Sequence, residues 1–137
     1  MLTKKKVILA GGSGFLGQAL AHSLLSDNVD VVILSRKISS APIHGRVVLW
    51  DGRSIGDWSN ELNGAYALFN LTGRSVDCRY TEKNRELIMN SRVDSTRVLG
   101  EAISRCSDVP RVWLNSSTAT VYKDRRGDLP PHDESSE

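Results

Sequence analysis

The feature that most constrains this chain is a glycine-rich stretch that directly follows an apolar run. Residues 7–17 read VILAGGSGFLG, and the chain continues to residue 26 with apolar side chains at helical spacing. A buried strand, a glycine turn and a helix in that order form an anion site from main-chain N–H groups and the helix dipole. Glycine is needed because a Cβ would block the approach of a pyrophosphate and the packing of the helix on the strand. The order therefore predicts dinucleotide binding. An ordinary glycine-rich turn is the alternative, and a P-loop is disfavoured because no Gly-Lys-Ser/Thr follows.

The second informative stretch is the polar end of another apolar run, at residues 29–34. Ser35, Arg36 and Lys37 follow it, and Arg36 lies nineteen residues after Gly17, about where a dinucleotide fold reads the adenosine ribose. An acidic residue there would accept a hydrogen bond from a 2′-hydroxyl and repel a 2′-phosphate. Two hydrogen bonds from cations, each worth roughly 1.5–3 kcal/mol, would favour NADP over NAD by at least about a hundredfold. The sequence thus predicts NADP, with solvated loop cations as the alternative.

Strand and helix patterns alternate along the rest of the chain. We expect strands over 6–10, 29–34, 46–50, 65–71 and 111–116. We expect helices over 14–26, over 57–62, and from a Thr81 cap to about residue 106. Such alternation predicts an α/β fold, a Rossmann-like doubly wound parallel sheet with strand order 3-2-1-4-5. The ligand crevice would then lie between strands one and four, at Gly11 and residues 70–73.

Several side chains near the predicted strand ends have two interpretations. Asp51 follows the third strand, where it could accept a hydrogen bond from an adenine amino group or serve as a turn residue. Trp50 and Trp58 are expected in the core rather than as stacking platforms. Arg74 lies in a polar loop after the fourth strand, and we expect it to meet water rather than an acidic substrate.

Composition narrows the partners of the chain. The net charge of +2 is too small to indicate nucleic acid, and no apolar run approaches the roughly 18 residues of a membrane span. The first seven residues lack the apolar core of a signal peptide. Cys78 and Cys106 stand alone, which favours a reduced cytosolic setting, and no His or Cys cluster has metal-ligand spacing. We therefore expect a cytoplasmic protein with a small-molecule substrate and with no metal, nucleic-acid or membrane partner.

Residues 115–122, NSSTATVY, closely resemble the strand-five signature of extended short-chain dehydrogenases/reductases, the nucleotide-sugar epimerase group. Gly11, Gly14 and Gly17 fit the GxxGxxG spacing of that group, and FNLTG at 69–73 looks like its strand-four turn. NSRVDST at 90–96 is similar to a segment of an atypical subfamily often labelled epimerase-family proteins. The resemblance runs from Lys6 to about Glu134.

This resemblance implies a role for each matching position. The glycines would cradle the pyrophosphate, residues 35–37 would bind the 2′-phosphate and Asp51 the adenine, and residues 71–73 would line the nicotinamide ribose. Arg92 falls where relatives often place a cofactor-contacting Asn. Thr118 aligns with an active-site Ser/Thr whose hydroxyl would hold a substrate oxygen. The cofactor-binding residues expected on this basis are Gly11, Gly12, Ser13, Gly14, Phe15, Leu16, Gly17, Ser35, Arg36, Lys37, Asp51, Leu71, Thr72, Gly73 and Arg92.

The resemblance also implies an NADP-dependent oxidoreductase or epimerase acting on a sugar nucleotide or a small carbonyl compound. Catalytic members use a Tyr-x-x-x-Lys acid–base motif, and these 137 residues contain none. We expect residues 1–122 to form the NADP-binding domain and residues 123–137 a polar loop leading to an absent substrate-binding part. A non-catalytic NADP-binding regulatory or interaction module is the alternative, whereas a ligand-free structural domain would leave the glycines unexplained. An exposed fifth strand would invite pairing, which predicts a homodimer or poor solubility of the chain in isolation.

Overall fold

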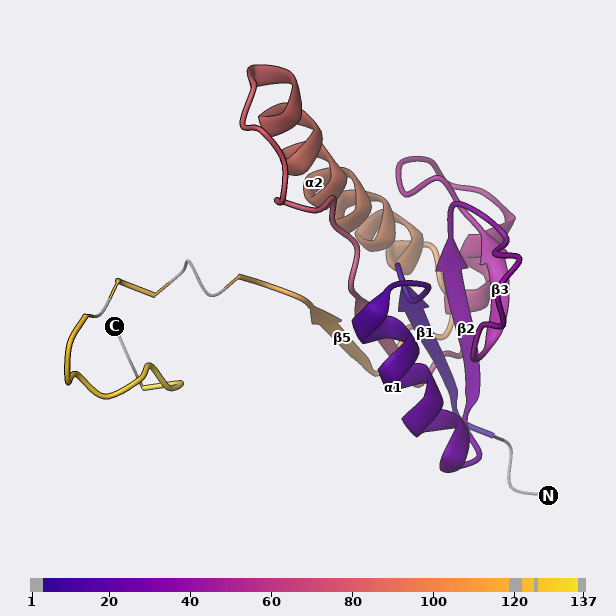
Figure 1. The fold of residues 1–137 in the computed structure, drawn as a ribbon. Helices are drawn as coiled ribbons and strands as arrows, with labels where there is room; N and C mark the ends of the chain where they lie inside the picture. Colours follow the sequence, from indigo (N-terminus) through magenta and orange to yellow (C-terminus); the bar gives the residue numbers. More distant parts are fainter. Residues whose placement is uncertain (1–3, 119–121, 125, 136–137) are drawn as a thin grey trace.

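A five-stranded parallel sheet forms the centre of the computed structural model, which describes residues 4–118, 122–124 and 126–135 (Figure 1). β1 (Lys6–Ala10) is the middle strand, with β2 (Asp30–Ser35) and then β3 (Arg46–Leu49) on one side. β4 (Ala67–Asn70) and then β5 (Val112–Asn115) lie on the other side. In this register Ile8 lies opposite Val32 on β2 and Leu68 on β4. The observed order β3-β2-β1-β4-β5 confirms the predicted doubly wound topology.

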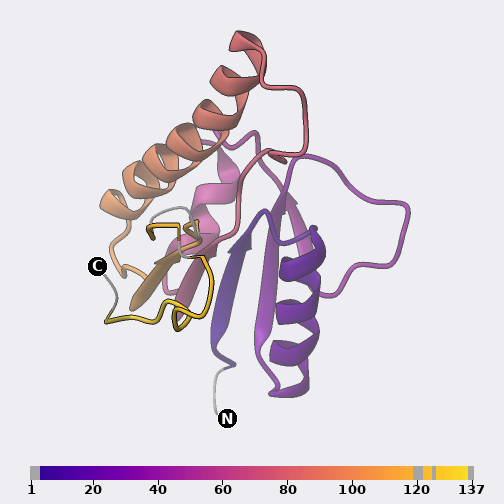
Figure 2. The same cartoon turned by 60° about the vertical axis from the view of Figure 1, so that its left-hand side comes forward.

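Helices cover both faces of this sheet (Figures 1 and 2). α1 (Phe15–Ser26) packs through Ala21, Leu20 and Leu24 on the face that carries Val7 and Leu9 of β1. α2 (Glu82–Ser104) and the 3-10 helix η1 (Asp57–Leu62) cover the opposite face. There Val98, Leu99 and Trp58 pack against Ile8 and Ala10. Because successive side chains of a strand point to opposite faces, a strand covered on both sides carries apolar residues in succession, as residues 7–10 of β1 and 31–34 of β2 do.

The element boundaries differ from the predicted ones by a few residues. The predicted strand over 46–50 ends at Leu49, although the Trp50 N–H still donates to the Ser35 carbonyl at 3.1 Å. β4 begins two residues later than predicted, because the Ala65 N–H donates to Leu62 at the end of η1 and not to a neighbouring strand. Thr81 caps α2 as predicted, since its hydroxyl oxygen accepts from the Asn84 N–H at 3.2 Å. The helix then ends at Ser104 and not at residue 106.

The two tryptophans lie in the core, as predicted. Trp50 and Trp58 are 6% and 4% exposed. Their rings pack edge to face, with the ring centroids 5.3 Å apart. The Trp58 indole N–H donates to the Ser54 carbonyl at 3.0 Å, so the buried polar atom has a partner. Their packing joins the end of β3 to η1.

Two surface features bear on the predicted partners. Val112, Trp113 and Leu114 of the edge strand β5 are 40%, 39% and 48% exposed, whereas Ile8 and Leu9 of β1 are fully buried. The homodimer inferred from such an edge stays a prediction. No helix among the described residues is long and apolar enough to cross a membrane.

Candidate functional site

A cavity of about 720 Å³ lies at the carboxyl ends of the central strands, where the sequence predicted the crevice. Five segments contribute to it: the glycine turn, the end of β2, the turn after β3, the loop after β4 and one face of α2. Its walls are formed by Gly11, Ser13, Gly14, residues 34–40, residues 50–53, residues 71–74, Leu87, Ser91 and Asp94. A volume of this size is within the range of cofactor and small-molecule sites.

Three of the four glycines in the turn are required by close backbone contacts. Gly11 has φ +72°, and a Cβ there would lie 3.1 Å from the Thr72 main chain. A Cβ on Gly12 would lie 2.9 Å from the Leu9 carbonyl oxygen, and one on Gly17 would lie 2.4 Å from the Gly12 Cα. The turn, β1 and α1 therefore touch through their main chains.

Gly14 differs, because a side chain there would have room. The nearest atom to a Cβ built there is the Gly11 carbonyl oxygen, at 3.7 Å, which is an ordinary contact. Gly14 is also the N-cap of α1 and supplies no side-chain hydrogen bond, and the first turn carries no acidic residue. The first-turn N–H groups of Phe15 and Leu16 and the positive end of the helix dipole are thus left for an anion. The side chains of these two residues are 89% and 65% exposed, and neither residue lines the cavity.

The segment after β2 presents two cations to the cavity. Ser35 is buried, and its hydroxyl bonds the Lys37 carbonyl at 2.9 Å and lies 3.3 Å from the Ser13 hydroxyl. These contacts fix the turn against the glycine segment. Arg36 and Lys37 are exposed on the cavity wall, and no carboxylate in the described part of the chain forms an ion pair with either. The wall is therefore positively charged at the end of β2.

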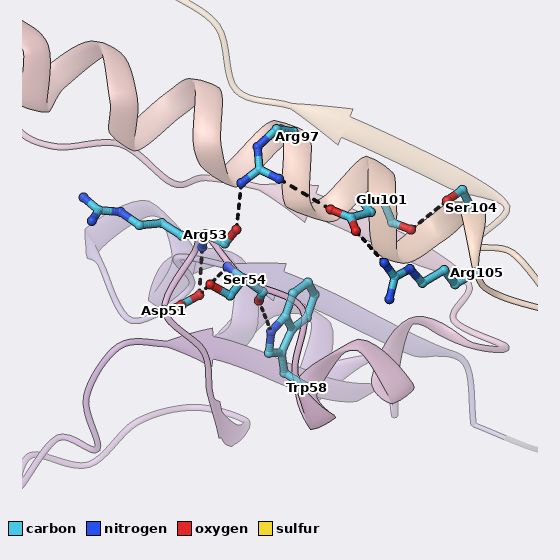
Figure 3. A network of polar contacts seen from close by, with 8 residues as sticks. All are labelled: Asp51, Arg53, Ser54, Trp58, Arg97, Glu101, Ser104 and Arg105. Carbon is cyan, nitrogen blue, oxygen red and sulfur yellow. Dashed lines mark hydrogen bonds and ion pairs between the residues drawn. The ribbon is translucent and has the colours of Figure 1, made fainter.

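The turn after β3 is organised by Asp51 (Figure 3). One oxygen of its carboxylate accepts from the Arg53 and Ser54 N–H groups, both at 2.8 Å. These two hydrogen bonds, that of Ser54 above all, hold the pKa of the Asp51 carboxyl below its ordinary value. Asp51 is thus a turn residue, and it also lines the cavity. Its contact with adenine stays a prediction.

Helix α2 fixes this turn from the other side (Figure 3). The Arg97 guanidinium donates to the Arg53 carbonyl at 2.8 Å and approaches Glu101 at 3.4 Å. The Arg53 side chain itself lies 3.6 Å from the Asp94 carboxylate, and both residues border the cavity. The rim after β3 is therefore attached to α2 through charged side chains.

The loop after β4 contains a buried polar atom that has no hydrogen-bond partner in the described part of the chain. The Thr72 N–H donates to the Asn70 side chain at 3.1 Å, while its hydroxyl oxygen is buried and has no hydrogen-bond partner among the described residues. Buried hydroxyls in native proteins are almost always satisfied, so such an atom on a cavity wall is a point where a ligand would bond.

Arg92 lies behind this loop and not on the cavity wall. Its guanidinium donates to the Arg74 carbonyl at 3.3 Å and to the Ile88 carbonyl at 3.1 Å. A Cβ on Gly73 would lie 3.0 Å from the Arg92 Cζ, so the absence of a side chain at Gly73 leaves room for the guanidinium. A direct contact between Arg92 and a cofactor stays a prediction, but the structure shows that Arg92 holds the cavity wall.

The structure brings most of the predicted cofactor residues to one cavity: Gly11, Ser13, Gly14, Ser35, Arg36, Lys37, Asp51, Leu71, Thr72 and Gly73. Gly12 and Gly17 support the wall from behind. Thr118 follows β5 by three residues, is exposed, and lies off the wall of this cavity. Residues 119–121 of the predicted strand-five signature lie outside the described residues, and the division of the chain at residue 122 stays a prediction.

Sequence reasoning missed the contribution of α2 to the cavity. Leu87, Ser91 and Asp94 line it, at positions i, i+4 and i+7 of the helix. That spacing places three side chains on one helical face, which is the signal that could have found them. Arg53 was also missed, because nothing in the local sequence shows that Asp51 folds its turn back toward α2.

With this geometry in view, comparison with known proteins identifies the family. The family model for the NAD dependent epimerase/dehydratase family matches residues 7–137. The chain belongs to this family. The epimerase family protein SSP1921 of Staphylococcus saprophyticus is 29% identical over 121 residues, which are 87% of this chain and 39% of the relative. The chain thus spans about two fifths of the length of this relative.

Solved structures of the same fold include two with different cofactors. The human epimerase family protein SDR39U1 (isoform 2) with NADPH aligns with a TM-score of 0.71 at 25% identity, over 86% of this chain and 38% of that one. MoeE5 in complex with UDP-glucuronic acid and NAD aligns with a TM-score of 0.73 at 22% identity, over 90% of this chain and 40% of that one. The predicted resemblance to epimerase-family short-chain dehydrogenases/reductases is confirmed.

Proposed function

We propose that this chain binds NADP(H) in the cavity at the strand ends. We further propose that it supplies the cofactor-binding part of an NADP-dependent oxidoreductase or epimerase acting on a sugar nucleotide or a small carbonyl compound. The choice of NADP as the cofactor rests mainly on Arg36 and Lys37. Both are cations on the cavity wall, and neither has an ion-pair partner among the described residues. A 2′-phosphate bound at this position would be neutralised by both.

Three further features fit a dinucleotide phosphate. The open side of Gly14 and the first-turn N–H groups of α1 suit the pyrophosphate. The Thr72 hydroxyl, which no described residue pairs, suits a ribose oxygen, since a ribose hydroxyl can donate to it or accept from it. The contacts of Gly11 keep the loop after β4 close enough to the turn for one ligand to touch both.

The fold alone does not decide between the two cofactors, because the human relative carries NADPH and MoeE5 carries NAD. The preference for NADP therefore rests on the side chains at the end of β2. An acidic residue would suit the ribose 2′-hydroxyl of NAD, and here the wall holds cations instead.

When bound, the nicotinamide would give or accept a hydride. The residues of this chain would bind and orient the cofactor: the glycine turn its pyrophosphate, Arg36 and Lys37 its 2′-phosphate, and residues 71–73 its second ribose. Thr118 would hold a substrate oxygen, as the family resemblance implies.

The test is a titration of the purified chain with NADPH and with NADH, followed by fluorescence and calorimetry. We expect NADPH to bind at least about a hundredfold more tightly than NADH, because two charged hydrogen bonds are lost with the 2′-phosphate. Arg36→Ala should reduce that preference by about tenfold or more. Arg79→Ala is the matched control, since Arg79 is an exposed cation that does not line the cavity. Equal affinity for the two nucleotides would contradict NADP, and no binding of either would contradict the cofactor site.

A further inference from the structure

The cavity wall carries one more positive charge than a 2′-phosphate site at the end of β2 explains. Arg36, Lys37, Arg53 and Arg74 line it, together with the carboxylates of Asp51 and Asp94. Arg53 is paired with Asp94 at 3.6 Å, and one oxygen of Asp51 accepts from two main-chain N–H groups. Among the described residues, none pairs with the Arg74 guanidinium.

Arg74 is also remote from the other cations in the fold. Arg36 and Lys37 follow β2, whereas Arg74 belongs to the loop after β4, and β1 lies between these two strands. Adjacent strands lie about 4.8 Å apart, which separates the ends of β2 and β4 by about 10 Å. A phosphate held by Arg36 and Lys37 therefore leaves Arg74 on the opposite wall, next to the residues expected at the nicotinamide ribose.

Helix α2 holds the main chain of Arg74 at both of its polar groups. The Arg74 N–H donates to the Ser91 hydroxyl at 2.9 Å, and its carbonyl accepts from the Arg92 guanidinium at 3.3 Å. Ser91 and Arg92 are fixed in turn, because both donate to the Ile88 carbonyl, at 2.8 Å and 3.1 Å. These bonds fix the main chain from which the Arg74 side chain extends, so that a ligand binding the guanidinium has less of the loop to order.

We propose that Arg74 binds an oxyanion of the second ligand, a carboxylate or a phosphate group, and that Ser91 and Arg92 are its positioning residues. The planar guanidinium, with its fork of N–H donors, matches the two oxygens of either group. This inference rests on the proposed function, because the second ligand is the substrate that meets the nicotinamide. It assigns an acidic substrate class to the site, where the sequence alone favoured water.

The experiment uses the full chain and two probes, malonate for a carboxylate and inorganic phosphate for a phosphate group. Each is titrated at constant ionic strength into protein saturated with NADPH and into protein without nucleotide, and binding is followed by two-dimensional NMR. We expect saturable binding of at least one probe, and the probe bound more tightly identifies the kind of oxyanion. Arg74→Gln should weaken it about tenfold or more while changing the NADPH dissociation constant less than about threefold. Arg79→Gln, on the same loop but off the cavity wall, should leave both affinities unchanged.

The positioning role has its own readout. Ser91→Ala should weaken binding of the same probe, and the double variant with Arg74→Gln should be no weaker than Arg74→Gln alone, because both changes remove one interaction. Additive losses would contradict positioning by Ser91.

The inference is overturned if neither probe binds, or if Arg79→Gln weakens probe binding as much as Arg74→Gln does. It is also overturned if Arg74→Gln weakens the binding of NADPH more than that of the probe. The last result would assign Arg74 to the cofactor. Probe binding that depends on Arg74 in a chain that fails to bind NADPH would instead contradict the proposed function and leave the oxyanion site standing.

Discussion

The two sides of the cavity are held together by different forces. On the glycine side, residues 11–17 meet β1 and α1 through main-chain contacts so close that a Cβ on Gly17 would lie 2.4 Å from Gly12. On the α2 side, the turn over 51–54 and the loop over 71–74 are held by side chains of α2, namely Ser91, Arg92 and Arg97. Steric contacts between main chains tolerate no substitution, whereas individual hydrogen bonds can be removed one at a time. The glycine side therefore depends on positions without a side chain, and the α2 side depends on individual polar contacts.

The largest effect should come from Gly17→Ala on the glycine side. Alanine normally stabilises the interior of a helix by about 0.5–1 kcal/mol relative to glycine. Here the new Cβ would collide with the Gly12 main chain, which cannot move without shifting β1, so we expect the free energy of unfolding to fall by about 3 kcal/mol or more. Urea unfolding measures the loss.

Gly100→Ala in α2 is the matched control for that substitution. A Cβ on Gly100 would meet the Trp113 ring at 3.5 Å, an ordinary van der Waals contact. We expect the free energy of unfolding of this variant to rise by about 0.5–1 kcal/mol, because alanine is preferred over glycine in the interior of a helix. Similar changes in both glycine variants would show that the close contact at Gly17 is not what fixes the turn.

A smaller effect, on binding and not on folding, should follow Gly14→Ala. The substitution fits the protein, because the nearest atom to the new Cβ is 3.7 Å away, and it narrows the side on which a pyrophosphate would approach. We expect stability to change by less than about 1 kcal/mol while NADPH affinity falls about tenfold or more. Calorimetric titration with NADPH, alongside urea unfolding, separates the two quantities. Unchanged affinity would place the phosphates away from α1.

The same contrast explains what the sequence could reveal. The glycine side is local, since one strand, one turn and one helix occur in succession, and Gly11, Gly14 and Gly17 could be assigned from their spacing. The cations at the end of β2 were found for the same reason. The α2 side joins residues far apart in the chain, such as Arg53 with Asp94 and Arg74 with Ser91. Predicting those contacts requires the register of α2 against the sheet, which local periodicity does not contain.

The α2 side should respond to a single lost hydrogen bond. Arg97→Met keeps much of the length of the side chain but removes its bond to the Arg53 carbonyl. We expect NADPH affinity to fall by about fivefold, because the lost hydrogen bond contributes roughly 1 kcal/mol to holding the turn after β3 in place. Arg105→Met is the control, because the Arg105 guanidinium pairs with the same Glu101 and not with the Arg53 carbonyl (Figure 3). Equal losses in both variants would show that the charge of α2 matters and the rim contact does not.

The smallest effect should be the acid dependence of the turn that Asp51 organises. Because main-chain hydrogen bonds hold the pKa of this carboxyl below its ordinary 3.8, its ionised form stabilises the folded chain above that value. The contribution is lost as the pH falls through the lowered pKa. Asp51→Asn keeps a carbonyl oxygen that can accept the same bonds without the charge. The variant should therefore be slightly less stable than the wild type at pH 7 and pH 5, and the difference should shrink as the pH falls from 3.8 through the lowered pKa. Urea unfolding at pH 7, 5 and 3 tests this. Glu61→Gln is measured in parallel for comparison, because the ion pair between Glu61 and Arg46 also lowers the pKa of a carboxyl, at a different place in the fold. A difference between wild type and Asp51→Asn that persists unchanged at pH 3 would mean that the amide fits the turn poorly. In that case the charge on Asp51 would contribute nothing to the α2 side.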